Sequence, residues 1–99
     1  MPAYLIAQLT ITDRSFFPEY RTGMAPLLKK HGGRQLVGGP PSEKLEGDDW
    51  VLPDHAVVVE FPTMEAARAW YNDADNEPLI KLRQSGAIGK LMLVDGIGS

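Results

Sequence analysis

The order of hydrophobic patterns along the chain constrains its fold more than any other feature. Stretches with alternating or β-branched residues, typical of strands, are separated by stretches whose apolar residues recur at helical spacing. Strands are expected at residues 3–11, 34–38, 55–61 and 89–94, and helices at residues 17–31 and 64–74, with a further helical segment from residue 76 to about residue 84. This order predicts an α+β, ferredoxin-like βαββαβ sandwich, in which a four-stranded antiparallel sheet carries its helices on one face.

Length and composition predict one domain, spanning residues 1–99. Hydrophobic residues make up 43% of the chain and charged residues 23%, which are values of a globular protein and not of a disordered one. The absence of cysteine excludes disulfides and thiolate metal sites. The start of the chain lacks a basic secretory signal, and no apolar run reaches the roughly 18 residues of a membrane span, so we expect a soluble, cytoplasmic protein with no membrane partner.

The two faces of the predicted sheet carry similar side chains, although one of them has no helices to cover it. If Leu5 and Val59 point at the helices, then Ile6 and Val58 point away from them. A sheet with one face in water shows polar residues there, and this face offers only Gln8, Thr10 and Glu60. A second copy of the chain is the simplest cover, so the pattern predicts a homodimer.

Several short stretches resemble one known family. They are Met1-Pro2-Ala3-Tyr4, Glu19-Tyr20-Arg21, Lys30-His31-Gly32-Gly33-Arg34, Leu45-Glu46-Gly47-Asp48, Val59-Glu60-Phe61-Pro62 and Ala66-Ala67-Arg68-Ala69-Trp70-Tyr71. In these the chain resembles the domain-of-unknown-function 1330 family of the dimeric α/β-barrel superfamily. The resemblance implies a ferredoxin-like subunit and a dimer whose sheets face one another. It implies no activity, because the family has none assigned, and the superfamily includes cofactor-independent monooxygenases, isomerases and structural domains.

Glu60 is the first candidate for a catalytic role. It lies in an apolar run in a strand expected at the centre of the sheet, on the face away from the helices. A carboxylate that loses hydration there is a candidate general acid or base, and His31 is a second candidate. In the alternative interpretation Glu60 forms an ion pair with Arg34 or with a cation of the partner subunit.

A second group of residues is a candidate site for a small molecule. Tyr20 and Arg21 lie within the first predicted helix, and Arg34 follows the turn after it. With His31 they could line a pocket for an anionic or aromatic molecule. In the alternative interpretation Tyr20 is a core aromatic residue and Arg21 a solvated charge.

The least regular stretch is residues 39–54, which holds three prolines and an acidic pair. A short strand could form near residues 43–46, and the remainder could cover a site. Trp50 lies in this stretch, and a tryptophan in a loop usually packs onto something. We therefore expect it to contact either the partner subunit or the mouth of a ligand pocket.

The chain carries no motif for a cofactor or for nucleic acid. A metal site would need His31, His55 and scattered carboxylates without recognisable spacing, so neither a metal nor a cofactor is expected. The net charge of −3 argues against nucleic-acid binding. Two functions remain: a homodimeric module that binds a small apolar or aromatic molecule or acts in protein interaction, and a cofactor-independent, monooxygenase- or isomerase-like enzyme acting on a small aromatic or carbonyl compound.

Overall fold

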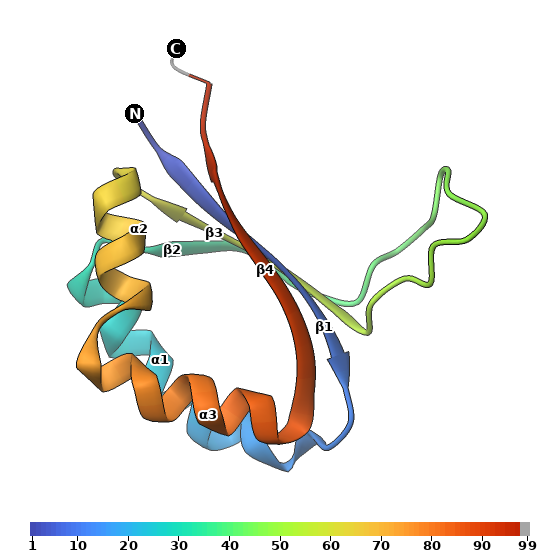
Figure 1. The fold of residues 1–99 in the computed structure, drawn as a ribbon, viewed down its shortest axis with the longest axis horizontal. Helices are drawn as coiled ribbons and strands as arrows, with labels where there is room; N and C mark the ends of the chain where they lie inside the picture. Colours follow the sequence, from blue (N-terminus) through green and yellow to red (C-terminus); the bar gives the residue numbers. More distant parts are fainter. Residues whose placement is uncertain (98–99) are drawn as a thin grey trace.

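Strand β1 (Ala3–Ile11) runs through the middle of the sheet and organises the domain (Figure 1). The computed structural model describes residues 1–97. After β1 come the 3₁₀ turn η1 (Arg14–Phe16), α1 (Phe17–Lys30), β2 (Arg34–Gly39), β3 (His55–Phe61), α2 (Met64–Tyr71), the 3₁₀ turn η2 (Ala74–Asn76), α3 (Glu77–Gly86) and β4 (Ala87–Asp95). The strands are ordered β2-β3-β1-β4 and every pair is antiparallel, as the sequence predicts.

The three helices cover one face of this sheet, and the other face is open (Figure 1). In β1, Ala3, Leu5, Ala7 and Leu9 are buried under the helices, whereas Tyr4, Ile6 and Gln8 between them are only half-buried. The core joins both strand and helix residues: Leu5, Met24, Leu27, Val59, Phe61, Ala67 and Trp70. Within it the Trp70 indole N–H donates to the Met24 sulfur at 3.2 Å, and the Phe61 and Trp70 rings lie 5.4 Å apart.

The helix boundaries follow from local chemistry. The Thr63 hydroxyl accepts a hydrogen bond from the Ala66 backbone N–H at 3.0 Å and so caps α2. At the end of α1, Gly32 adopts a positive φ of 74°, which a residue without a Cβ reaches at no steric cost. Gly86 ends α3 where the chain passes so close to the Asp13 carbonyl that a Cβ would collide with it.

Residues 40–54 differ from the expectation. The short strand near residues 43–46 does not form, and this described stretch contains no helix or strand. Pro40, Pro41 and Pro53 remove backbone donors, and Gly47 takes a φ of 108°, so the segment is unsuited to pairing along the edge. Within residues 1–97, no helix has the length and apolar composition that crossing a membrane requires.

Candidate functional site

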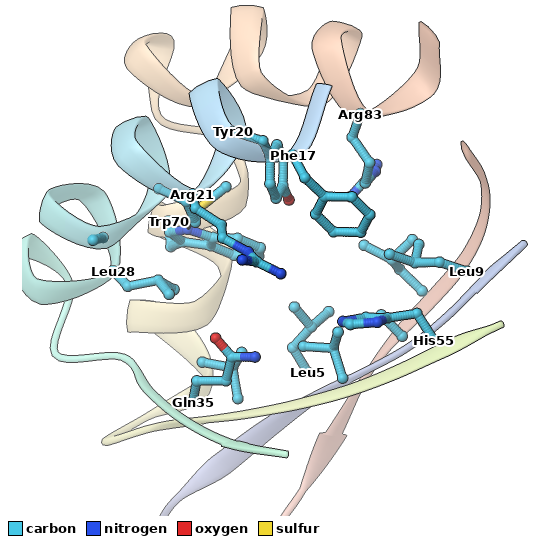
Figure 2. A pocket seen from close by; sticks show the side chains of 16 residues that line it. Leu5, Leu9, Phe17, Tyr20, Arg21, Leu28, Gln35, His55, Trp70 and Arg83 are labelled. Atoms are coloured by element: carbon cyan, nitrogen blue, oxygen red, sulfur yellow. Dashed lines mark hydrogen bonds between the residues drawn. The ribbon is translucent and has the colours of Figure 1, made fainter. Parts of the chain in front are cut away.

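A cavity of about 320 Å³ lies between α1 and the helix-covered face of the sheet (Figure 2). Its floor is apolar and comes mainly from β1 and β3, through Leu5, Leu9, Val57 and Val59. Two small side chains, Ala7 on β1 and Ala25 on α1, also line it. Because these alanines cannot fill the space between the helix and the sheet, the two layers leave room for a ligand.

Five polar side chains converge on this apolar space: Tyr20, Arg21, Gln35, His55 and Arg83. Figure 2 shows Tyr20 and Arg21 pointing from α1 toward the sheet, and His55 pointing back from it. Arg21 and Gln35 are exposed, so they mark the side of the cavity that is open to solvent. The Arg21 guanidinium lies 5.2 Å from the centre of the Phe17 ring, a cation–π contact that holds it at this mouth.

Tyr20 and Arg83 form the inner polar end of the cavity. Burial raises the pKa of the Tyr20 hydroxyl, and the neighbouring Arg83 charge opposes that rise. Tyr20 is therefore neutral at physiological pH, with a hydroxyl that can donate to a ligand. Arg83 comes from the last turn of α3 and is only 5% exposed, which is rare for a charged side chain.

His55 opens β3 opposite Leu9 of β1, so its ring faces the cavity and not the open face. Burial lowers the pKa of His55, and the positive charges of Arg21 and Arg14 lower it further. The Phe17 ring lies 5.6 Å from the imidazole. At neutral pH this side chain is an uncharged imidazole, which offers one nitrogen as a hydrogen-bond or proton acceptor.

Glu60 and Arg34 lie on the opposite, open face of the sheet. Arg34 donates to one Glu60 carboxylate oxygen at 3.0 Å, and the Tyr4 hydroxyl donates to the other at 3.0 Å. The hydrogen bond to Glu60 is the main reason why the pKa of Tyr4 is raised. This geometry agrees with the alternative interpretation, in which Glu60 forms an ion pair, and neither Glu60 nor Arg34 lines the cavity.

His31 and Trp50 also lie outside the cavity. His31 Nε2 lies 2.8 Å from an Asp73 carboxylate oxygen that also accepts from Lys30 at 2.9 Å, so the three residues tie the end of α1 to the segment after α2. These contacts hold the pKa of Asp73 well below its usual range. Trp50 is 45% exposed and borders a groove beside Gln8 and Lys90, on the open face.

Sequence reasoning therefore placed Tyr20 and Arg21 at the cavity but missed Gln35, His55 and Arg83. Two of the missed residues had a usable signal. His55 is in phase with Val57 and Val59 along one strand, which assigns it to the helix-covered face. Arg83 follows Leu79 by one helical repeat of four residues, so it shares the inward face of α3.

The chain is similar to one family and to several solved structures. A family model described as "Domain of unknown function (DUF1330)" matches residues 2–97, and no curated protein matches the sequence significantly. A protein of unknown function from Rhodopseudomonas palustris has a similar structure, with a TM-score of 0.81 at 16% identity over 99% of this chain and 84% of that one. SnoaB, a cofactor-independent oxygenase from Streptomyces nogalater, gives 0.68 at 12% identity over 99% and 95%. A dimeric protein of unknown function and ferredoxin-like fold from Bacteroides fragilis gives 0.54 at 11% over 96% of each chain. The predicted ferredoxin-like α+β fold is confirmed.

Proposed function

Because the chain belongs to the DUF1330 family, to which no activity is attached, we propose its function from its own cavity: it is a homodimeric module that binds a small, largely apolar molecule between α1 and the sheet. The single observation that carries this proposal is the cavity of about 320 Å³ with an apolar floor and polar groups gathered on one side. Ligand pockets typically measure about 300–1,000 Å³ and have this division between apolar walls and a few orienting groups. The size suits a molecule of one or two rings.

The homodimer is proposed from the open face of the sheet. Its central row across four strands is Val37, Val58, Ile6 and Met92, all apolar. Val37 is 48% exposed and Met92 55% exposed, although both belong to the sheet. Polar residues flank this row, with Arg34, Glu60 and Tyr4 on one side and Gln8 and Lys90 on the other. An apolar centre inside a polar rim is typical of an interface, and a two-fold pair of identical faces satisfies it.

An enzymatic function is the second candidate, and the uncharged His55 favours it. SnoaB, which shares the fold, is a cofactor-independent oxygenase. In this chain His55 could accept the proton of an acidic C–H beside a carbonyl group, while the electron pair of the broken bond moves to the carbonyl oxygen. Such a proton transfer predicts deuterium exchange at that carbon of a bound carbonyl compound in heavy water. His55→Gln would abolish the exchange, and exchange at the uncatalysed rate in the wild type would exclude this candidate.

The binding function is tested by filling the cavity. The probe is para-fluoroacetophenone, a small aromatic carbonyl compound followed by fluorine NMR. Val57→Trp places a large ring on the cavity floor, whereas Val51→Trp adds the same ring to an exposed loop position. We expect saturable binding in the wild type and in Val51→Trp, and its loss in Val57→Trp. Equal binding by the two variants, or none by the wild type, would contradict the proposal.

A further inference from the structure

Arg83 is the buried charge that the fold itself leaves without a counter-ion. Among residues 1–97, the ion pairs join Lys30 and His31 to Asp73, Arg34 to Glu60 and Lys81 to Glu77, and none involves Arg83. A guanidinium keeps its charge at every physiological pH. Burying such a charge without a partner is strongly unfavourable, and for this reason buried arginines are normally paired. The position of Arg83 on the cavity wall therefore indicates that the partner is something the cavity receives.

The charge distribution around the cavity points the same way. The chain as a whole is acidic, with 13 acidic residues against 10 lysines and arginines. Yet no aspartate or glutamate lines the cavity, whereas Arg21 and Arg83 both do. An acidic protein that has no carboxylate on the wall of this apolar cavity, and places two arginines there, has a site of positive potential. Figure 2 shows the two guanidinium groups at different points of the cavity wall.

The neutral polar residues complete an anion site. The charge of Arg83 acts on the Tyr20 hydroxyl, which means that the two side chains are neighbours. Both can therefore donate hydrogen bonds to the same anionic group of a ligand. A guanidinium presents donors in a planar fork that matches the two oxygens of a carboxylate. The apolar floor formed by Leu5, Leu9, Val57 and Val59 offers nothing to a small hydrated ion such as phosphate, but suits a hydrocarbon or aromatic body.

We infer that the ligand of this cavity is an amphipathic monocarboxylate, with its carboxylate held by Arg83 and Tyr20 and its aromatic or aliphatic body on the floor of β1 and β3. This inference deepens the proposed binding function and rests on it. Arg21, at the mouth, attracts the anion and does not need to touch it. The ligand supplies the negative charge that the fold omits, so Arg83 gains the counter-ion that it lacks among residues 1–97 of the free protein.

The test compares two probes of nearly equal shape that differ in charge: para-fluorophenylacetate and para-fluorophenylacetamide, both followed by fluorine NMR. We expect the wild type to bind the acid about tenfold more tightly than the amide, which is the usual gain from a hydrogen bond to a charged partner. Arg83→Met keeps an unbranched apolar stem, which is shorter than arginine, and removes the charge and all five N–H donors. It should remove the preference for the acid while the amide still binds.

The matched control is Arg34→Met, which removes the same charge from the open face and should keep the full preference. Arg83→Lys retains the charge without the planar fork and should keep part of it. Equal binding of acid and amide by the wild type overturns this inference alone, whatever the variants do. A preference that disappears in Arg34→Met and survives in Arg83→Met also overturns it. If neither probe binds the wild type, the proposed binding function fails with it.

Discussion

The two faces of the sheet are formed by the same strands but differ in whether the helices cover them. In β1, Leu5 is buried under the helices while its neighbour Ile6 is half-buried on the open face. In β3, Val59 is likewise buried under the helices, and Val58 is half-buried on the open face. On the helix-covered face, the helices and the sheet enclose the cavity beneath α1, whereas no helix of residues 1–97 covers the open face (Figure 1).

A similar apolar composition therefore serves different purposes on the two faces. On the covered face, alanines at positions 7 and 25 create a space, and arginine, tyrosine and histidine side chains give it polarity. On the open face, Arg34 and Tyr4 both bind Glu60, and the central apolar row is left exposed. Because side chains alternate along a strand, a slip of one residue would exchange the two roles.

The largest effect is expected from Phe61→Ala on the covered face. Phe61 is 0% exposed and packs against Trp70, so its removal should cost about 3–5 kcal/mol of the free energy of unfolding. Urea titration at several protein concentrations measures this. The loss should be the same at every concentration, because Phe61 packs in the core of one subunit. The control, Met92→Ala on the open face, should give a loss that grows with concentration, since it acts through the dimer. If the losses of both variants depended on concentration in the same way, the claim that only the open face forms the dimer would be contradicted.

A smaller effect on folding but a clear one on assembly is expected from Val58→Asp. The new carboxylate would lie in the centre of the open face between Ile6 and Val37, where the proposed partner subunit would remove its water. An unpaired charge in such a place should weaken dimerisation by at least about 100-fold, which corresponds to roughly 3 kcal/mol. Sedimentation equilibrium measures the dissociation constant of the dimer. Fluorine NMR with para-fluoroacetophenone measures whether the cavity of the variant still binds the probe. Unaltered dimerisation would show that this face is not the interface.

The smallest effect concerns His55 and pH. The pKa of His55 is lowered in the folded chain, so below about pH 6.5, its ordinary value, the unfolded chain takes up the proton more readily. The free energy of unfolding should therefore fall as the pH drops through this range and recover as it rises. Stability curves of the wild type and His55→Gln measure the difference, because the other titrating groups are common to both. Parallel curves would mean that the covered face does not keep the imidazole uncharged.

Much of the fold was accessible from the sequence because its signals are local. Alternation in residues 3–11 and the β-branched run around Val58 fixed the two central strands, and Thr63 fixed the start of α2. The prediction of a strand near residues 43–46 was wrong. Local strand propensity does not suffice where nearby prolines remove backbone donors and no neighbouring strand is available for pairing. Local patterns carry little information about such long-range requirements.

The candidate site was less accessible, since it depends on which face each residue takes. Glu60 attracted attention as a carboxylate in an apolar run, yet its strand register sets it beside Arg34 and Tyr4. In the sequence Arg83 is in phase with Leu79, but this spacing does not distinguish a buried charge from one that reaches solvent at the edge of the helix face. In the folded chain α3 packs against α1 and η1, and Arg83 is buried on the wall of the cavity. The burial of such a charge depends on how the helices pack on the sheet, so it is recognised from the structure.

One crystal structure tests the comparison most directly: that of the wild-type protein with para-fluorophenylacetate. The prediction is one probe in each subunit between α1 and the sheet, with its carboxylate against Arg83 and Tyr20, and two copies of the chain joined through the row of Ile6, Val58 and Met92. A probe held instead on the open face by Arg34, with the cavity closed by its own side chains, would contradict the assignment of ligand and partner to the two faces.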